Sequence, residues 1–203
     1  MGISHLFDLT GKTALVTGSS EGLGFAMAQG LAAAGASLIL NGRDEKKLAA
    51  AATSFADDGH KVGARPFDVA DEQAVLSTFE RFDAEGVEID ILVNNAGVQF
   101  RKPMVDLKTE EWRRVVDIHL TGAFQVGREA AKRMIARGRG GKIINIASLS
   151  SEVARATISP YVAAKGGMRM LTRSMAAEWA QHDIQANAIG PGYIATEMNR
   201  ALL

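Results

Sequence analysis

Hydrophobic and polar positions alternate along the chain in two kinds of segment, which predict strands and helices in regular succession. Short runs that are apolar and rich in β-branched residues predict strands. Longer segments with apolar residues at helical spacing predict helices, and Thr109 is expected to cap one of them. The predicted strands span residues 13–17, 37–40, 61–67, 89–95, 142–148 and 184–189. The predicted helices span residues 22–34, 44–58, 71–84, 109–137 and 159–181.

This succession predicts a single α/β domain over residues 1–203. Strands that are apolar along their whole length are typical of a parallel sheet covered by helices on both faces. Right-handed crossovers then give a doubly wound, Rossmann-type domain with ligands at the carboxyl ends of the strands. The uncharged segment 22–42 is long enough to cross a bilayer. Its five glycines and the change of pattern at Gly35 instead indicate a helix, a turn and a strand, so we expect no membrane span.

Composition excludes several classes of partner and chemistry. The formal net charge is zero, which gives no indication of nucleic-acid binding or of an acidic partner. The chain has no cysteine, so disulfides and cysteine-ligated metals are excluded, and no metal site is predicted. The start of the sequence has no basic segment followed by an apolar run, so no secretory signal is expected. These features fit a cytoplasmic protein.

A glycine-rich turn, "TGSSEGLG", joins the first predicted strand to the first helix. Gly18, Gly22 and Gly24 would allow a tight turn, close approach of a pyrophosphate and close packing of the helix on the sheet. The helix N-terminus offers free N–H groups to phosphates, and the hydroxyls of Ser19 and Ser20 can add donors. The spacing G-x-x-x-G-x-G differs from the general dinucleotide fingerprint, and an ordinary strand-to-helix turn is the alternative interpretation.

Tyr161 and Lys165 lie four residues apart in "SPYVAAKGG", and on a helix they share one face. A phenol normally ionises near pH ~10, and a neighbouring ammonium favours the phenolate. The pair is therefore a candidate proton-transfer group. Taken alone, the spacing favours the alternative of a tyrosine ring that packs on the aliphatic stem of the lysine.

Five motifs together resemble the short-chain dehydrogenase/reductase family. They are "TGSSEGLG", "NNAG" at 94–97, Ser148 thirteen residues before Tyr161, "YVAAK" and "PG" at 191–192, in the family's order across nearly the whole chain. Within the family, "LNGR", "NNAGVQFRKPM", "SSEVARATISPYVAAKGG" and "PGYIATEM" are most similar to sugar-acid oxidoreductases of the gluconate 5-dehydrogenase type.

The resemblance implies a catalytic set in which Tyr161 exchanges a proton with the substrate oxygen. Lys165 would hold the nicotinamide ribose and lower the pKa of the tyrosine, and Ser148 would steady the substrate oxygen. Family members usually carry asparagine in the middle of the long helix, where this chain has His119 in "DIHLTGAF". A neutral histidine can hold a water as an amide does. We expect protonation of His119, with a pKa somewhat below about 6.5, to stop catalysis; the alternative is a histidine that only packs.

The resemblance also implies the cofactor contacts. Beyond the glycine turn, Tyr161 and Lys165, they would come from Leu23, Asp68, Val69, Asn94, Ala96, Gly97, Pro191, Gly192, Ile194 and Thr196. At the end of the second strand, Gly42 occupies the position where an acidic residue would select NAD, and Arg43 follows it. An arginine there can bind a 2′-phosphate. Glu21 opposes that preference, so NADP is favoured and NAD remains the alternative.

The sugar-acid resemblance implies a small-molecule substrate with a carboxylate. Arg101 and Arg155, with Lys102 as a weaker candidate, would lie near the strand ends, and Glu152 could bind polyol hydroxyls. Each of these charges can equally be a solvated loop residue. Relatives that reduce 3-oxoacyl groups or other ketones are an alternative.

Two other classes of function fit the sequence less well. A dinucleotide-binding sensor or scaffold is opposed by the intact Ser148, Tyr161 and Lys165. A Ser–His hydrolase lacks the G-x-S-x-G elbow. The helices that start near 109 and 159 are expected to pack on their copies, as in the family's homotetramers. The family usually continues through a further helix and a seventh strand after "TEMNRALL", so we expect the sequence to be incomplete at this end.

Overall fold

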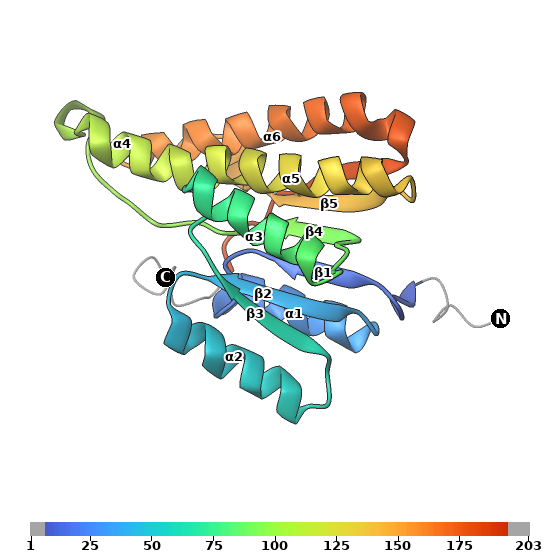
Figure 1. Cartoon of the computed structure of the whole chain (residues 1–203). Helices are drawn as coiled ribbons and strands as arrows, with labels where there is room; N and C mark the ends of the chain where they lie inside the picture. Colours follow the sequence, from blue (N-terminus) through green and yellow to red (C-terminus); the bar gives the residue numbers. More distant parts are fainter. Residues whose placement is uncertain (1–6, 195–203) are drawn as a thin grey trace.

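The computed structural model, which describes residues 7–194, contains one parallel sheet of six strands (Figure 1). The strand order is β3-β2-β1-β4-β5-β6, and every neighbouring pair is parallel. The strands are β1 (Thr13–Val16), β2 (Ser37–Gly42), β3 (Val62–Pro66), β4 (Ile91–Asn94), β5 (Gly141–Ile146) and β6 (Ile184–Ile189). The predicted doubly wound α/β fold is therefore confirmed.

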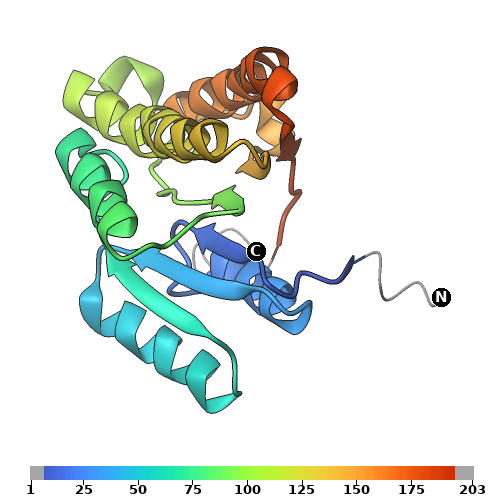
Figure 2. The ribbon, with the colours of Figure 1, turned by 45° about the vertical axis from the view of Figure 1, so that its right-hand side comes forward.

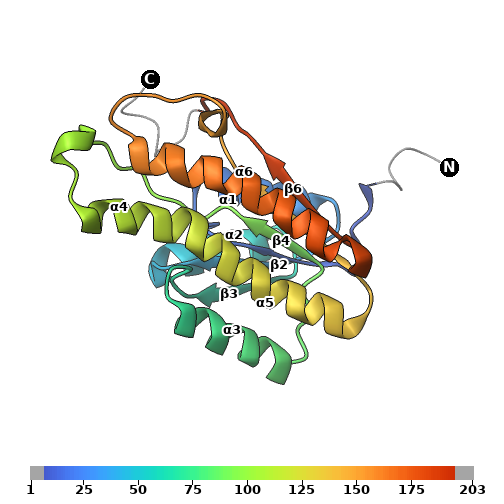
Figure 3. The same cartoon turned by 90° about the horizontal axis from the view of Figure 1, so that it is seen from above.

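Helices cover both faces of the sheet (Figures 1 and 2). The helices on one face are α1 (Gly22–Ala33) and α2 (Glu45–Asp57). Those on the other face are α3 (Glu72–Ala84), α4 (Thr109–Val116), α5 (Gly122–Arg137) and α6 (Ser159–Trp179). Seen from above, α4 and α5 run in line beside α6, and α3 lies next to α5 (Figure 3).

Alternate residues of the central strands enter two separate cores. Leu15 and Leu92 are paired in register and face the core beneath α3 and α5. Val16 and Val93, the next residues along, face the core beneath α1 and α2. Because successive side chains of a strand point to opposite faces, a strand buried on both sides must be apolar at every position. This is the reason for the uninterrupted apolar runs in the sequence.

The uncharged segment 22–42 folds as predicted into a helix, a turn and a strand. Helix α1 ends at Ala33, and Gly35 turns the chain with a φ of +96°, a conformation that favours glycine. Strand β2 then begins at Ser37. Among residues 7–194, no helix is long and apolar enough to cross a membrane.

The predicted helix 109–137 is continuous but irregular. Between α4 and α5 the chain makes a π-helical turn, Asp117–Thr121, in which His119 lies. The predicted cap is wrong by one residue, because the helix begins at Thr109 and Lys108 takes the N-cap position. The Glu111 side chain accepts a hydrogen bond from the backbone N–H of Lys108 at 2.8 Å, so a carboxylate of the first turn stabilises this end.

The strand order reverses direction at β1. From β1 the chain runs outward through β2 and β3, then returns to the other side of β1 and continues through β4, β5 and β6. The chain consequently leaves the carboxyl ends of β1 and β4 toward opposite faces of the sheet. In open α/β sheets this reversal is where ligands bind.

Candidate active site

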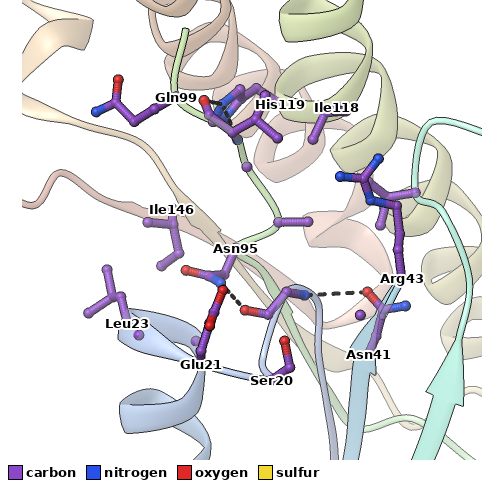
Figure 4. Close-up of a pocket in the computed structure, with 18 of the residues that line it drawn as sticks. Ser20, Glu21, Leu23, Asn41, Arg43, Asn95, Gln99, Ile118, His119 and Ile146 are labelled. Carbon is purple, nitrogen blue, oxygen red and sulfur yellow. Dashed lines mark hydrogen bonds between the residues drawn. The ribbon is translucent and has the colours of Figure 1, made fainter. Parts of the chain in front are cut away.

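A pocket of about 660 Å³ lies at the carboxyl ends of the strands, over the point where the strand order reverses. Figure 4 shows Ser20 and Glu21 at the glycine turn, Asn41 and Arg43 at the end of β2, and Gln99 and His119 farther along. The predicted residues that line it are Gly18, Ser20, Gly22, Leu23, Gly24, Arg43, Asp68, Val69, Ala96, Gly97, His119, Ser148, Tyr161, Lys165, Pro191, Gly192 and Ile194. Thr196 lies outside the described residues.

The glycine turn is packed so closely that side chains are excluded from it. A Cβ atom on Gly24 would lie 2.2 Å from the carbonyl oxygen of Gly18, and one on Gly18 would lie 2.8 Å from Cα of Ala96. The Glu21 side chain makes no capping bond to α1. The first N–H groups of this helix therefore lack a side-chain acceptor and suit a phosphate. The turn and the pocket volume fit a dinucleotide.

Two predicted cofactor residues are used inside the fold instead. The hydroxyl of Ser19 is buried and donates to the carbonyl oxygen of Val16 at 2.8 Å, so the expectation that it faces a phosphate is wrong. The Asn94 amide is also buried and donates to the Asn145 side chain at 2.9 Å and to the carbonyl oxygen of Ala123 at 3.2 Å. Neither residue lines the pocket, because each satisfies buried polar groups behind it.

Two asparagines that the sequence reasoning missed shape the pocket instead. The Asn95 amide donates to the carbonyl oxygens of Thr17 and Gly18, at 3.0 and 2.9 Å (Figure 4). The Asn41 side chain accepts from the backbone N–H of Gly18 at 3.3 Å. Both asparagines therefore hold the glycine turn against neighbouring strands. Their position in the sequence could have indicated this role, since each lies at or just after the carboxyl end of a strand.

Ser148, Tyr161 and Lys165 meet at one end of the pocket, as the motifs predict. Ser148 follows β5, whereas Tyr161 and Lys165 share a face of α6. The Lys165 ammonium is buried, donates to the carbonyl oxygen of Ile146 at 2.5 Å and lies 5.6 Å from the centre of the Tyr161 ring. Burial lowers the pKa of Lys165 to about 8.

The pKa of Tyr161 is raised above its ordinary value, contrary to the prediction. Burial is the largest cause, and a hydrogen bond with the Ser148 side chain opposes it. The prediction failed because it counted the attraction of the Lys165 ammonium and left out the cost of placing a phenolate in a buried site. The phenol is therefore held in its protonated form, which is the form that can donate a proton.

His119 is buried between Gly97 and Tyr161. Its ring meets the Tyr161 ring edge to face, with centres 5.2 Å apart, and a Cβ on Gly97 would lie 2.4 Å from Cε1 of the imidazole. Nε2 lies 2.9 Å from the carbonyl oxygen of Val98 and 3.0 Å from its N–H. Nδ1 is buried and has no hydrogen-bond partner within the described residues.

Burial, reinforced by the charge of Lys165, lowers the pKa of His119 to about 3. The imidazole is therefore neutral, as expected. However, its protonation falls several pH units below the range predicted from the sequence, because that prediction did not include full burial of the ring. An acidic limb of activity just below pH 6.5 cannot come from this residue.

Gly42, at the end of β2, lies beside the glycine turn. A Cβ on Gly42 would lie 3.3 Å from the Ser20 hydroxyl oxygen, a tight contact that a small shift of that side chain could relieve. Arg43 lines the pocket and pairs with Asp68 at 3.3 Å. Both of these side chains are partly exposed, which leaves the guanidinium within reach of a ligand.

None of the four candidate substrate residues lines this pocket, and Lys102, the weaker candidate, pairs with Glu111 at 2.8 Å. The Glu152 carboxylate pairs with Arg169 at 2.7 Å, so it is engaged by α6. Arg155 donates to the Tyr193 hydroxyl at 2.6 Å, and both side chains are exposed. Arg101 is exposed. The loops that carry these residues had no regular pattern from which side-chain directions could be predicted.

A doubly wound sheet with a glycine turn at its reversal point and a Ser–Tyr–Lys set at the other end of the same pocket defines a dinucleotide-dependent oxidoreductase. The chain belongs to the short-chain dehydrogenase family, whose family model matches residues 12–203. The family and reaction class predicted from the five motifs are confirmed.

Several relatives are similar to almost the whole of this chain. The gluconate 5-dehydrogenase of Gluconobacter oxydans is 43% identical over 99% of this chain and 79% of its own length. The crystal structure of a gluconate 5-dehydrogenase from Burkholderia cenocepacia in complex with NADP and tartrate is 47% identical, with a TM-score of 0.95 over 99% of this chain and 78% of that one. An Agrobacterium tumefaciens protein, provisionally described as a gluconate dehydrogenase, is 61% identical, with a TM-score of 0.95 over 97% of this chain and 77% of that one.

Proposed function

We propose that the protein is an NADP-dependent oxidoreductase that interconverts a secondary alcohol and a ketone on a sugar acid such as gluconate or 5-ketogluconate. The observation that carries this proposal is the meeting of Ser148, Tyr161 and Lys165 in a pocket shaped for a dinucleotide. The substrate class is supported by the similarity to gluconate 5-dehydrogenases. A 3-oxoacyl or other ketone reductase of the same family is the second candidate.

The three residues divide the work around one substrate oxygen. A bound nicotinamide would supply or accept the hydride. In the reducing direction Tyr161 donates its phenolic proton to the ketone oxygen, and in the oxidising direction it takes the proton back from the alcohol. The Ser148 hydroxyl, which hydrogen-bonds with Tyr161, holds that oxygen in place. The Lys165 ammonium stabilises the phenolate that forms after the proton leaves.

The NADP preference rests on Gly42 and Arg43. The glycine leaves no carboxylate to bind a ribose 2′-hydroxyl, and the guanidinium of Arg43 lies in the pocket where it can bind a 2′-phosphate. NAD is the alternative cofactor. His119 would act beside Lys165 as a neutral ring that holds a water in place of the usual asparagine, and its Nδ1 has no hydrogen-bond partner among the described residues.

The wider organisation is proposed on separate grounds. Residues 1–203 would form one dinucleotide-binding domain, since a single sheet links the two cores. A homotetramer is supported by the exposed side chains of Trp112, Phe124 and Met170, which are 36%, 43% and 54% accessible on the outer helices α4, α5 and α6. A cytoplasmic location is consistent with the absence of cysteine.

The test is a Tyr161→Phe substitution assayed with NADPH and 5-ketogluconate by absorbance at 340 nm. Loss of the phenolic proton should lower kcat by at least about a hundredfold, as general acid–base groups usually contribute. NADPH affinity should stay within about twofold, because the ring keeps its packing. A variant with more than a tenth of the wild-type kcat would refute the assigned acid. A wild-type protein that binds NADPH but reduces none of a panel of sugar acids, 3-oxoacyl esters and simple ketones would instead favour the sensor alternative.

A further inference from the structure

The end of the pocket beside β2 contains charged side chains in matched pairs. Lys47 of α2 pairs with Glu21 at 2.9 Å, and Arg43 pairs with Asp68 at 3.3 Å. All four residues line the pocket. The side chains of the first pair are 55% and 60% exposed. Each cation at this end is thus held by a carboxylate that lines the same space.

A carboxylate at this end of the pocket disfavours a phosphate. Glu21 is the residue just before α1, and its charge would repel an anion bound at the start of that helix. Asp44 also lines the pocket, but its Oδ1 accepts from the N–H groups of Lys46 and Lys47 at 3.0 Å and caps α2. With Glu21, Asp44 and Asp68 against Arg43 and Lys47, three carboxylates face two cations, so the loss of either cation would leave a marked negative excess.

We propose that Lys47 is a second specificity residue for the 2′-phosphate, and that this phosphate displaces Glu21 as the partner of its ammonium. The inference rests on the proposed NADP dependence. An exposed lysine–glutamate pair contributes little stability, so exchanging its carboxylate for a phosphate costs little. The flexible stem of lysine lets the ammonium move between the two acceptors. A phosphate near charge −2 attracts the ammonium more strongly than one carboxylate does.

The same geometry gives no role to Lys47 when the ligand lacks the 2′-phosphate. The ammonium then stays with Glu21, and the neutral pair leaves the rest of the pocket unchanged. Discrimination between the two nicotinamide cofactors is thus shared between Arg43 and Lys47. Glu21 competes with the phosphate for Lys47, so it lowers the affinity for NADP in the present sequence.

The test uses two ligands that differ only by the phosphate in question, 2′,5′-ADP and 5′-AMP, titrated by calorimetry at low ionic strength. Lys47→Met should weaken 2′,5′-ADP by about tenfold more than it weakens 5′-AMP, whose phosphate meets only the uncovered charge of Glu21. Lys46→Met is the matched control, since it removes the same charge from an exposed neighbour on α2 that does not line the pocket. It should leave both affinities within about twofold. Glu21→Gln should strengthen 2′,5′-ADP several-fold.

The double variant Glu21→Gln/Lys47→Met separates a direct contact from simple neutralisation of Glu21. A direct contact predicts that Lys47→Met still weakens 2′,5′-ADP when residue 21 is glutamine. Disappearance of the loss in that background would overturn the proposal, as would equal losses for both ligands or an equal loss in Lys46→Met. If the wild-type protein binds 2′,5′-ADP tightly and Lys47→Met does too, only this inference fails. Wild-type protein that prefers 5′-AMP would overturn the NADP dependence itself.

Discussion

Replacing His119 by asparagine should remove one specific loss of stability, which arises as the pH falls from 7 to 5. The imidazole is 3% exposed, and burial lowers its pKa to about 3 in the folded chain. In the unfolded chain its pKa is about 6.5. Below pH 6.5, His119 therefore binds a proton in the unfolded state but not in the folded state. The contribution of the neutral imidazole to stability is fully present above that pH and is lost as the pH falls toward 3.

The size of the effect follows from the separation of the two pKa values. Each pH unit between them costs about 1.4 kcal/mol, so at pH 5 the loss is about 2 kcal/mol, and the ceiling near pH 3 is about 5 kcal/mol. For a chain whose total stability is on the order of 5–15 kcal/mol, this is a large fraction. Carboxylates whose pKa values are lowered in the folded chain, such as Glu129, also reduce the stability of the protein when they are protonated at lower pH. They are present in both proteins, so they do not affect the comparison.

The measurement is urea unfolding, followed by circular dichroism at half-unit steps from pH 4.5 to 8, for wild type and His119→Asn. The difference in unfolding free energy should be constant above pH 7 and change by about 2 kcal/mol in favour of the variant by pH 5. Asparagine has no titratable group and is small enough for the site. If the difference does not change with pH, the imidazole is not held neutral by burial, and the reasoning is refuted.

Two other substitutions test the cofactor end of the pocket. Arg43→Ala should weaken NADPH binding by about ten- to a hundredfold through loss of a charged hydrogen bond and barely affect NADH; equal losses in fluorescence titrations would contradict this assignment. Gly24→Ala should destabilise the protein by about 1–3 kcal/mol and abolish tight cofactor binding, because its Cβ would lie 2.2 Å from the carbonyl oxygen of Gly18. Gly30→Ala, on the same helix, is the control and should raise the melting temperature slightly, because a Cβ there would meet no heavy atom within 4 Å. A similar loss in both glycine variants would show that the close approach is unimportant.

The sequence predicted the layers of the fold because burial on both faces leaves a direct mark on each strand. Leu92 and Val93 are adjacent and enter opposite cores, so neither position tolerates a polar residue. The π-helical turn is not indicated by any comparable pattern in the sequence. Its change of backbone hydrogen bonding depends on packing around His119, and the local pattern of "DIHLTGAF" fits a regular helix equally well.

The candidate site was predicted where backbone geometry fixes the side chain and less well where it does not. Tyr161 and Lys165 share a helix face by spacing alone. Asn94 and Asn95 are neighbours, but β4 ends between them. The side chain of Asn94 therefore bonds inside the fold, whereas that of Asn95 bonds to the glycine turn. The partners of Glu152 and Arg155, namely Arg169 and Tyr193, are set by loop conformations that no periodicity encodes.

The π-helical turn at Asp117–Thr121 also separates two functions within one continuous helical segment. An α-helix rotates about 100° per residue, so the wider turn resets the angular phase of everything that follows. Within the turn, Ile118 and His119 line the pocket, while Val126 and Met134 of α5 pack in the core beneath the sheet. Loss of a single residue here would swing one of these faces away from its target. The segment therefore tolerates substitution far better than a change of length.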